Sequence, residues 1–429
     1  MQQVKADPVL PVDSSIRIMI LPEIAMKIAL GGKVSDTPDG VQVAYESDAL
    51  VMHRDDHETA LRVARRLRPH IPQRLTPGVL ISLMSIAGKF VTEELFQPGR
   101  VRVIYYPARS TPAGSFYRCI LPALAIRERS TKVSAHVAQI GSAREALDYD
   151  VIVIQMTHTP QTIQFAKKLK ELGKKIVFEV DDVYDRVEAW HDYQQRDFDL
   201  DLFYQMLGIA DVVTVTTKYL ASHYREHTRE EIVVLPNYVL KHEFPRASAD
   251  PHEGFRVLWA GSPSHFGDLA VVGRALSAFA IAHPDVKLVF FGRKPVEFHA
   301  SDKQIEFHDW TDFKEYPNKL AALAGDVAIA PLADVPFNYG KSNLKLLEYG
   351  ACGYPIIASN VGPYKETGQG RVVLCDKESD WTDALEAMYA RPDVRKEWKR
   401  LSGELAEEYD AMTRMPDLES FFLDLAGRK

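Results

Sequence analysis

The stretch GKSNLKLLEYGACGYPIIAS, residues 340–359, decides the fold that this chain is expected to adopt. The apolar run DVAIAPL, residues 326–332, precedes it and has the composition of a buried strand. Ser342 is the expected N-cap of a short helix that ends at Gly353, and Pro355 opens a second strand. Strand, loop, helix and strand in this order form one unit of a parallel α/β sheet.

The polar face of the predicted helix carries Lys341, Lys345 and Glu348, which are neighbours because they are spaced by four and three residues. The start of a helix offers free N–H groups and a positive dipole end, so two lysines beside it favour an anion such as a diphosphate. Glu348 lies one turn deeper, where it would accept hydrogen bonds from sugar or ribose hydroxyls. A solvated helix face with a Glu–Lys pair explains the same pattern equally well.

Composition places the chain among ordinary globular proteins. It has 429 residues, of which 46% are hydrophobic and 26% charged, with a formal net charge of −7. A mildly acidic chain is not a typical nucleic-acid-binding protein, although a local basic patch can still bind phosphates. This length predicts two or three domains.

The cysteines and the apolar segments indicate the cellular compartment in which the protein is expected. Cys119, Cys352 and Cys375 are few, odd in number and far apart, which favours a reducing cytoplasm over a disulfide framework or a zinc site. The most apolar stretch, residues 79–88, is too short to span a membrane. We therefore expect a cytoplasmic protein without signal peptide or integral membrane association, and attachment at a membrane surface stays open.

From Arg100 onward, strand-like runs alternate with helical patterns over short connections. The first series of runs is RVRVIYYP, KVSAHVAQI, YDVIVIQM, KKIVFEVDD, DVVTVTT and IVVLPN, and the second is FRVLWAG, VKLVFFG, IEFHDW, DVAIAPL, PIIAS and RVVLCD. The Pro-containing segment 242–254 separates the two series and reads as a linker. This rhythm predicts an α/β protein with two Rossmann-like domains that face each other across a cleft, with ligands at the carboxyl ends of the strands.

The predicted boundaries divide the chain into four parts. They are an accessory N-terminal region (1–99), a first Rossmann-like domain (100–245), a second Rossmann-like domain (254–410) and a C-terminal tail (411–429). The first part is the least regular. IRIMIL and VQVAYES have the composition of strands, and a basic helix carries Arg62, Arg65, Arg66 and Arg68. That arginine cluster would suit phosphates, nucleic acid or an acidic membrane, but a solvated helix face is the commoner cause.

The second half resembles the donor-binding domain of a GT-B glycosyltransferase, close to the retaining group numbered family 4. The match covers residues 255–389 and rests on AGSPSH, FFGRKP, FHDW and the closing PL…KSNLKLLEYGACGYPIIAS. VLPNYVL, residues 234–240, resembles the segment that leaves the first domain of that family. The first half matches mainly through the order of its elements, and residues 1–99 are not covered.

The resemblance implies roles for the matching positions. Glu348 corresponds to the carboxylate that holds the ribose hydroxyls, the helix start faces the diphosphate, and Trp310 stacks on the nucleobase. The donor-binding residues implied in this way are Gly261, Ser262, His265, Arg293, Asp309, Trp310, Lys341, Ser342, Asn343, Leu344, Lys345 and Glu348.

Two positions depart from the family pattern. Family members carry a second glutamate eight positions before the one at Glu348, where this chain has Gly340. The usual Arg and Lys after the first strand of the domain are replaced by SPSHFGD. Lys341, Lys345 and His265 are the residues we expect to bind the phosphates instead.

The chemistry of glycosyl transfer needs stabilisation of the departing diphosphate and removal of a proton from the acceptor. Lys341 and helix N–H groups serve the first need without a metal. Asp181 and Asp182, at the carboxyl end of KKIVFEVDD, are the acidic candidates for the second, although they would also suit a helix cap. Gly114, Arg118 and His158 follow predicted strands and are expected on the acceptor side.

The predicted function is transfer of a sugar from a nucleoside-diphosphate-sugar to an acceptor hydroxyl, with retention as the resemblance implies and no cofactor beyond this co-substrate. The acceptor classes considered are a glycan, a lipid-linked sugar and a modified DNA base. The acidic pairs of DFDLD, residues 197–201, fit a helix start better than a metal site. The alternatives left open are an epimerase of the same architecture, a DNA-directed glycosyltransferase and a non-catalytic protein of the same fold. A phosphorylase is disfavoured because no lysine is clearly suited to a pyridoxal Schiff base.

Overall fold

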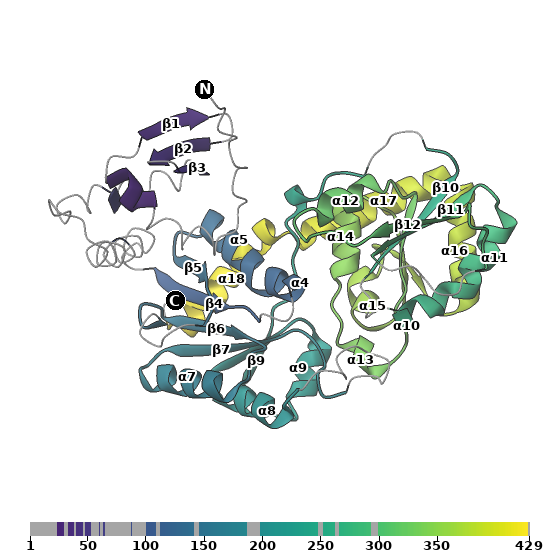
Figure 1. The fold of residues 1–429 in the computed structure, drawn as a ribbon. Coiled ribbons are helices and arrows are strands. Elements are labelled where there is room, and N and C mark those ends of the chain that lie inside the picture. Colours follow the sequence, from purple (N-terminus) through teal and green to yellow (C-terminus); the bar gives the residue numbers. More distant parts are fainter. Residues whose placement is uncertain are drawn as a thin grey trace.

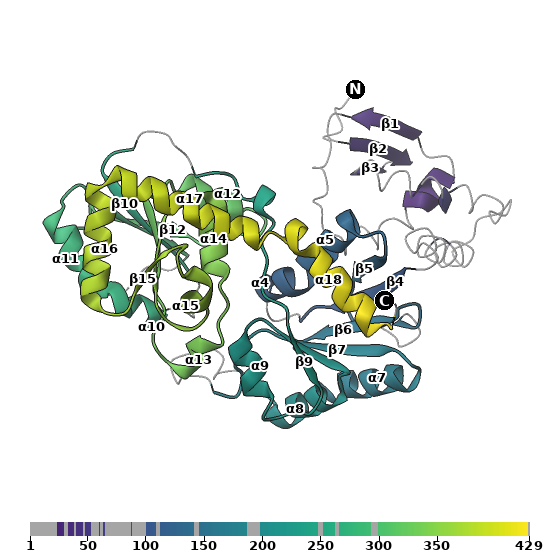
Figure 2. The same ribbon diagram turned by 180° about the vertical axis from the view of Figure 1, so that it is seen from behind.

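The protein is described here by a computed structural model, shown in Figure 1 and, turned by 180°, in Figure 2. The described residues are 24–29, 33–37, 40–45, 48–52, 60, 63–64, 87, 100–108, 112–140, 146–186, 198–247, 252–261, 266–292 and 299–427.

The N-terminal region contains a small antiparallel sheet of order β1-β2-β3, drawn in purple in Figure 1. Its strands are β1 (Lys33–Thr37), β2 (Gly40–Tyr45) and β3 (Asp48–Met52). The strand expected at VQVAYES is confirmed as β2. IRIMIL and the cluster of Arg62, Arg65, Arg66 and Arg68 lie outside the described residues.

The first Rossmann-like domain is built on a parallel sheet of order β5-β4-β6-β7-β8-β9. Its strands are β4 (Val101–Tyr106), β5 (Val133–Val137), β6 (Val151–Gln155), β7 (Lys175–Val180), β8 (Val212–Val215) and β9 (Glu231–Val234). Its helices are α4 (Pro112–Ser115), the π-helical turn η2 (Phe116–Ile120), α5 (Leu121–Arg129), α7 (Pro160–Glu171), α8 (Leu200–Ile209) and α9 (Lys218–Tyr224). The apolar strands are buried because helices cover both faces of a parallel sheet.

The second domain repeats this design on a parallel sheet of order β12-β11-β10-β13-β14-β15. Its strands are β10 (Phe255–Ala260), β11 (Val286–Gly292), β12 (Ile305–Asp309), β13 (Val327–Ala330), β14 (Ile356–Ser359) and β15 (Val373–Cys375). Its helices are α10 (Phe266–Leu269), the 3-10 turn η6 (Ala270–Val272), α11 (Gly273–Ala282), α12 (Tyr316–Ala322), α13 (Pro336–Tyr339), α14 (Leu344–Cys352), α15 (Gly362–Gly368), α16 (Glu378–Ala390) and α17 (Pro392–Glu408). The predicted two-domain α/β fold is confirmed.

The chain crosses between the domains twice, at neighbouring points. The first crossing runs through Val239 and the 3-10 turn η4 (Lys241–Glu243), and the second joins α17 to α18 (Ala411–Leu425). Backbone hydrogen bonds tie the crossings together, since the Val239 N–H donates to Tyr409 O (3.1 Å) and the Ala411 N–H donates to Val239 O (2.8 Å).

Residues 411–425, set apart from the second domain in the sequence as a tail, form the helix α18 (Figure 2). Its buried side chains Met415, Leu418 and Phe422 pack into the core of the first domain beside α5. The C-terminal segment therefore covers the first domain and does not project from the second.

The two domains also touch through α13 and the residue that follows it. Phe337 of α13 is fully buried in the core cluster of the first domain, which includes Val183 and Leu220. A Cβ atom at Gly340 would lie 2.4 Å from Val183 Cγ2 and 3.0 Å from Leu220 Cδ2. Gly340, where the family pattern has a glutamate, is thus a position at which the first domain leaves no room for a side chain.

We predict that Gly340→Ala lowers the apparent melting temperature, because overpacking at a buried contact costs about 1–3 kcal/mol. Gly208→Ala is the matched control, since no atom lies within 4 Å of a Cβ built there. Alanine in a helix interior is favoured over glycine by about 0.5–1 kcal/mol, so the control keeps or raises the melting temperature. Equal melting temperatures for Gly340→Ala and the wild type would contradict the tight contact.

Two expectations drawn from composition concern thiols and membranes. Cys119, Cys352 and Cys375 are all buried and free, so no disulfide joins any two of them in the structure. Within the ranges that the structure describes, none of the helices combines the length and apolar character needed to cross a membrane.

Candidate functional site

A cavity of about 280 Å³ opens between the two domains, at the carboxyl ends of both sheets. Most of the predicted site residues meet there. Those that line it are Gly114, Arg118, Asp181, Asp182, Gly261, Trp310, Lys341, Ser342, Leu344, Lys345 and Glu348, together with Ala113, Tyr117, Asn237, Ala260, Phe313, Tyr316 and Tyr364. The cavity is called the interdomain cleft below.

The first turn of α14 forms one wall of the interdomain cleft. The N-cap is Asn343 and not Ser342, so the predicted cap is wrong by one residue. The Asn343 amide bonds the Thr367 hydroxyl at 3.4 Å, and among the described residues it caps no first-turn N–H. The first N–H groups of a helix have no partner within it, and they carry the positive end of its dipole. At the other end of α14, Gly353 has a left-handed φ of 80°, as expected for a helix C-cap.

Lys345 sits between α14 and the end of β10. Its Nζ donates to the Ala260 carbonyl oxygen (2.6 Å) and lies 4.9 Å from the ring centre of Trp259. A Cβ atom at Gly261 would come within 2.9 Å of this Nζ, so glycine at that turn leaves the space that the ammonium needs. Burial lowers the pKa of Lys345 to about 8, while the carboxylates of Asp268 and Glu348 oppose the shift.

Glu348 is a buried charged group of the interdomain cleft, with 8% of its surface exposed. The Tyr117 hydroxyl of the first domain donates to its Oε1 (2.6 Å), and the Tyr316 hydroxyl of α12 donates to its Oε2 (2.8 Å). Burial raises the pKa of the Glu348 carboxyl, and the two tyrosines and Lys345 oppose that rise. Each carboxylate oxygen has a second lone pair, so Glu348 can accept further hydrogen bonds.

Trp310 provides a flat apolar surface at the edge of the interdomain cleft. It follows β12, stacks on Phe291 with ring centres 5.5 Å apart and planes 24° apart, and remains 50% exposed. Gly292 makes this packing possible, because a Cβ atom there would lie 2.7 Å from the Trp310 ring and its φ is 106°. An exposed, well-supported indole suits the stacking of a planar ligand.

Asp181 and Asp182 face α14 from the end of β7. Lys341 Nζ lies 2.6 Å from Asp182 Oδ2 and 4.1 Å from the centre of the Phe337 ring, so the ion pair joins the two domains. Asp181 Oδ1 accepts a hydrogen bond from the Tyr184 hydroxyl (2.7 Å). No helix begins within residues 181–186, so helix capping is not their role there.

The electrostatic state of Asp182 depends on Lys341. Burial raises the pKa of the Asp182 carboxyl, and the neighbouring ammonium opposes the rise. Removing this ammonium from Asp182 would therefore raise the carboxyl pKa and make it a stronger base.

Arg118 reaches the cleft from η2 and is held by buried partners. Its Nε donates to Glu179 Oε1 (2.6 Å) and its Nη1 donates to Asn237 Oδ1 (2.9 Å). Thr214 donates a hydroxyl hydrogen bond to the other Glu179 oxygen. A buried ion pair satisfied in this way holds the guanidinium in one place, beside Gly114.

Several predicted residues lie elsewhere. His158 is not among the described residues that line the cleft. Its Nδ1 is hydrogen-bonded to Met156 O (2.7 Å) and its ring packs on Phe198. Asp309 ends β12 with an exposed side chain, and Asn343 is turned toward Thr367. The remaining three, Ser262, His265 and Arg293, lie outside the described residues.

Sequence reasoning missed the two tyrosines that bind Glu348. Both follow strands whose carboxyl ends meet at the cleft, β4 and β12, and that position was the available signal. Tyr117 and Glu348 are separated by 231 residues, so no local pattern could have paired them.

Comparison with known proteins agrees with this geometry. Residues 254–391, which make up most of the second domain, match the family model described as Glycosyl transferases group 1. D-inositol 3-phosphate glycosyltransferase of Paenarthrobacter aurescens is 36% identical over 109 residues, which make up 24% of this chain and 26% of that protein. The chain therefore spans about a quarter of the length of this relative.

Solved structures share the fold over most of the chain. Sucrose-phosphate synthase from Thermosynechococcus elongatus is 14% identical with a TM-score of 0.54, covering 77% of this chain and 100% of that one. HepE from Anabaena, in complex with UDP, is 12% identical with a TM-score of 0.54, covering 76% of this chain and 100% of that one. At this identity the likeness shows the GT-B fold alone. The family match, the relative and this fold together support a glycosyltransferase.

Proposed function

We propose that the protein transfers a sugar from a nucleoside-diphosphate-sugar to an acceptor hydroxyl in the interdomain cleft. One observation carries the proposal. Glu348, Trp310 and the first turn of α14, with Lys341 and Lys345, lie together on one side of the cleft. These groups match the ribose, the diphosphate and the base of one ligand. Proteins of the same fold support this choice of donor, because HepE forms complexes with UDP and with UDP-glucose.

On the donor side, positive charges of the protein attract the diphosphate. Lys345, Lys341 and the free N–H groups of α14 stabilise the negative charge that grows on the diphosphate as the glycosidic bond breaks. Glu348 holds the ribose through the lone pairs that Tyr117 and Tyr316 leave free. No metal is needed for this step, because the cations and the helix dipole come from the chain itself.

The acceptor side uses Asp181 and Asp182. When the diphosphate draws Lys341 toward itself, Asp182 loses its partner and becomes a stronger base for the acceptor proton. Gly114 and Arg118 line the wall on this side. Retention of configuration follows from the family resemblance, and the anomeric form of the product, read by NMR, tests it.

The acceptor belongs to the glycan, lipid-linked sugar or modified DNA classes. The sequence feature that would favour DNA, the cluster of Arg62, Arg65, Arg66 and Arg68, lies outside the described residues. Three buried free thiols support a reducing cytoplasm as the place of the reaction.

A panel of nucleotide sugars tests the donor site by thermal shift. We predict that one class raises the melting temperature, because a ligand at about 100 times its Kd stabilises the folded state by about 2.7 kcal/mol. Glu348→Ala should weaken the affinity for that donor about 10- to 100-fold, since a hydrogen bond to a charged group contributes about 1.5–3 kcal/mol. It should also abolish or severely reduce transfer.

Tyr117→Phe is the matched control for the structural role of Glu348. It removes the hydrogen bond between the domains but leaves the carboxylate in place. We expect this variant to bind the donor much better than Glu348→Ala does. Equal losses in both variants would make Glu348 a domain contact only, and no response to any nucleotide sugar would favour a non-catalytic protein.

The pH dependence of transfer tests Lys345. Its pKa is about 8, and only the protonated form attracts the diphosphate. We predict that kcat/KM for the donor, which reports the free enzyme, falls as pH rises through about 8 when measured between about pH 6.5 and 9.5. Lys345→Arg should remove this fall, because arginine stays charged. The same inflection in the arginine variant would assign it to another group.

A further inference from the structure

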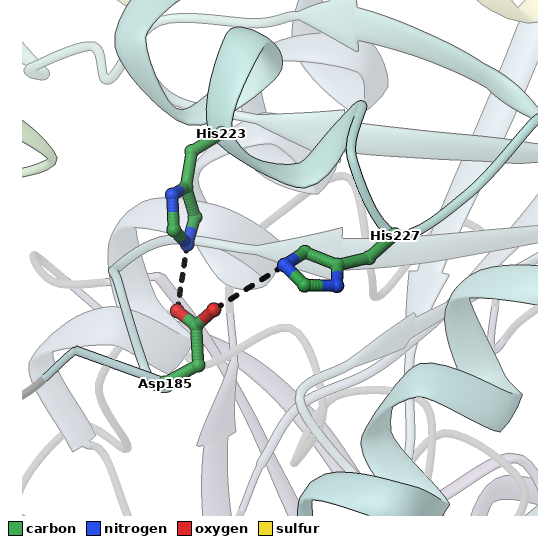
Figure 3. Close-up of side chains that lie close together, drawn as sticks. All are labelled: Asp185, His223 and His227. Carbon is green, nitrogen blue, oxygen red and sulfur yellow. Dashed lines mark hydrogen bonds and ion pairs between the residues drawn. The ribbon is translucent and has the colours of Figure 1, made fainter.

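A second cluster of ligating side chains lies outside the interdomain cleft. Asp185 follows β7, His223 lies in the last turn of α9, and His227 lies in the turn that follows this helix (Figure 3). The backbone N–H of His227 donates to Tyr224 O, so the chain still turns like a helix there. The four-residue spacing of the two histidines therefore places both rings on one side, above the carboxylate.

The three side chains converge closely. His223 Nε2 lies 2.7 Å from Asp185 Oδ1, and His227 Nε2 lies 3.5 Å from Asp185 Oδ2. One ligand atom from each residue lies within 4.8 Å of the others. Asp185 and His223 are buried, with 8% and 3% of their side chains exposed, and His227 is 27% exposed.

The polar atoms of this cluster are not all satisfied by the protein. His227 Nε2 is buried and has no hydrogen-bond partner within the described residues. It faces a carboxylate that already accepts from His223 and from the Tyr204 hydroxyl (3.2 Å). A buried polar atom left unpaired costs about 1–3 kcal/mol, so the arrangement calls for a species that binds all three groups.

We propose that Asp185, His223 and His227 bind a divalent transition metal ion of the zinc class. Two imidazole nitrogens and one carboxylate oxygen are ligands that zinc accepts, at about 2.0–2.2 Å. Calcium needs six to eight oxygen ligands, and the cluster offers a single carboxylate. Water completes the coordination of an ion held by three protein ligands.

The surroundings resemble the outer ligand sphere of a metal site. The Tyr204 hydroxyl orients the carboxylate of Asp185, and its ring stacks on His227 with centres 4.4 Å apart and planes 12° apart. Such partners fix the orientation of metal ligands.

The metal would act as a clamp on the acidic side of the interdomain cleft. Asp185 belongs to the same loop as Asp181 and Asp182, and α9 already holds this loop through the Tyr224 hydroxyl, which donates to Asp182 O (2.7 Å). A metal shared by Asp185 and the two histidines ties the loop to α9 at a second point. None of its three ligands is a described residue that lines the cleft, so the site is separate from the donor site. Binding of the metal ion at Asp185, His223 and His227 does not depend on the proposed function.

Metal analysis of the untagged full chain tests this site. After treatment with a chelator, saturation with Zn²⁺ and removal of free metal, we expect about one zinc ion per chain and a higher melting temperature than that of the stripped protein. Replacement of Zn²⁺ by Co²⁺ should give the visible absorption of a low-coordinate site with nitrogen and oxygen ligands.

Single variants locate the ion. His223→Gln and His227→Gln should both lose the zinc and its effect on the melting temperature. His283→Gln is the control, because His283 pairs with a single carboxylate, that of Glu386 (2.9 Å), and should leave the zinc content unchanged. The proposal is overturned if the wild type retains no zinc, or if the two cluster variants bind as much zinc as His283→Gln does. The comparison of stripped and loaded wild type decides the matter even if a variant fails to fold.

Discussion

The structure depends on one buried carboxylate. Glu348 accepts hydrogen bonds from Tyr117 of the first domain and from Tyr316 of the second, so it stabilises the contact between them. Isolated burial of a charge is costly, and these donors together with nearby Lys345 reduce that cost. The same group lies in the wall of the cleft, where the ribose of a donor would reach it. In the proposed function, domain contact and ligand binding are therefore coupled through this single side chain.

A second contact between the domains is also made by residues that have roles in the proposed reaction. Lys341 pairs with Asp182 across the cleft, and both groups have roles in the proposed reaction. A diphosphate that attracts Lys341 weakens this pair and changes the basicity of Asp182. In the proposed reaction, donor binding replaces contacts between protein groups by contacts with substrate, and it makes Asp182 a stronger base at the same time. The two adjacent crossings of the chain near Val239 and Ala411 are the covalent connections around which the domains meet.

The fold and half of the site follow from local sequence patterns, whereas the rest depends on distant contacts. The alternation of strands and helices predicts both sheets, and the spacing on α14 predicts that Glu348 and Lys345 share a face. The bond to Tyr117 spans 231 residues and leaves no local signature. The helix starts one residue later than predicted, because Ser342 and Asn343 are equally good N-cap residues and the sequence pattern does not choose between them. In the sequence, Gly340 stands where the family pattern has a glutamate, which suggests that a ligand-binding side chain is missing. The structure gives the reason for the glycine, because the first domain packs against this position and leaves no room for a side chain.

The most direct test of the donor site is a crystal structure of the protein with the nucleoside diphosphate that stabilises it most. We expect the ribose hydroxyls within hydrogen-bond distance of the Glu348 carboxylate, the diphosphate at the first turn of α14, and the base against Trp310. A nucleotide bound outside the interdomain cleft, or one whose diphosphate lies away from α14, would contradict this expectation.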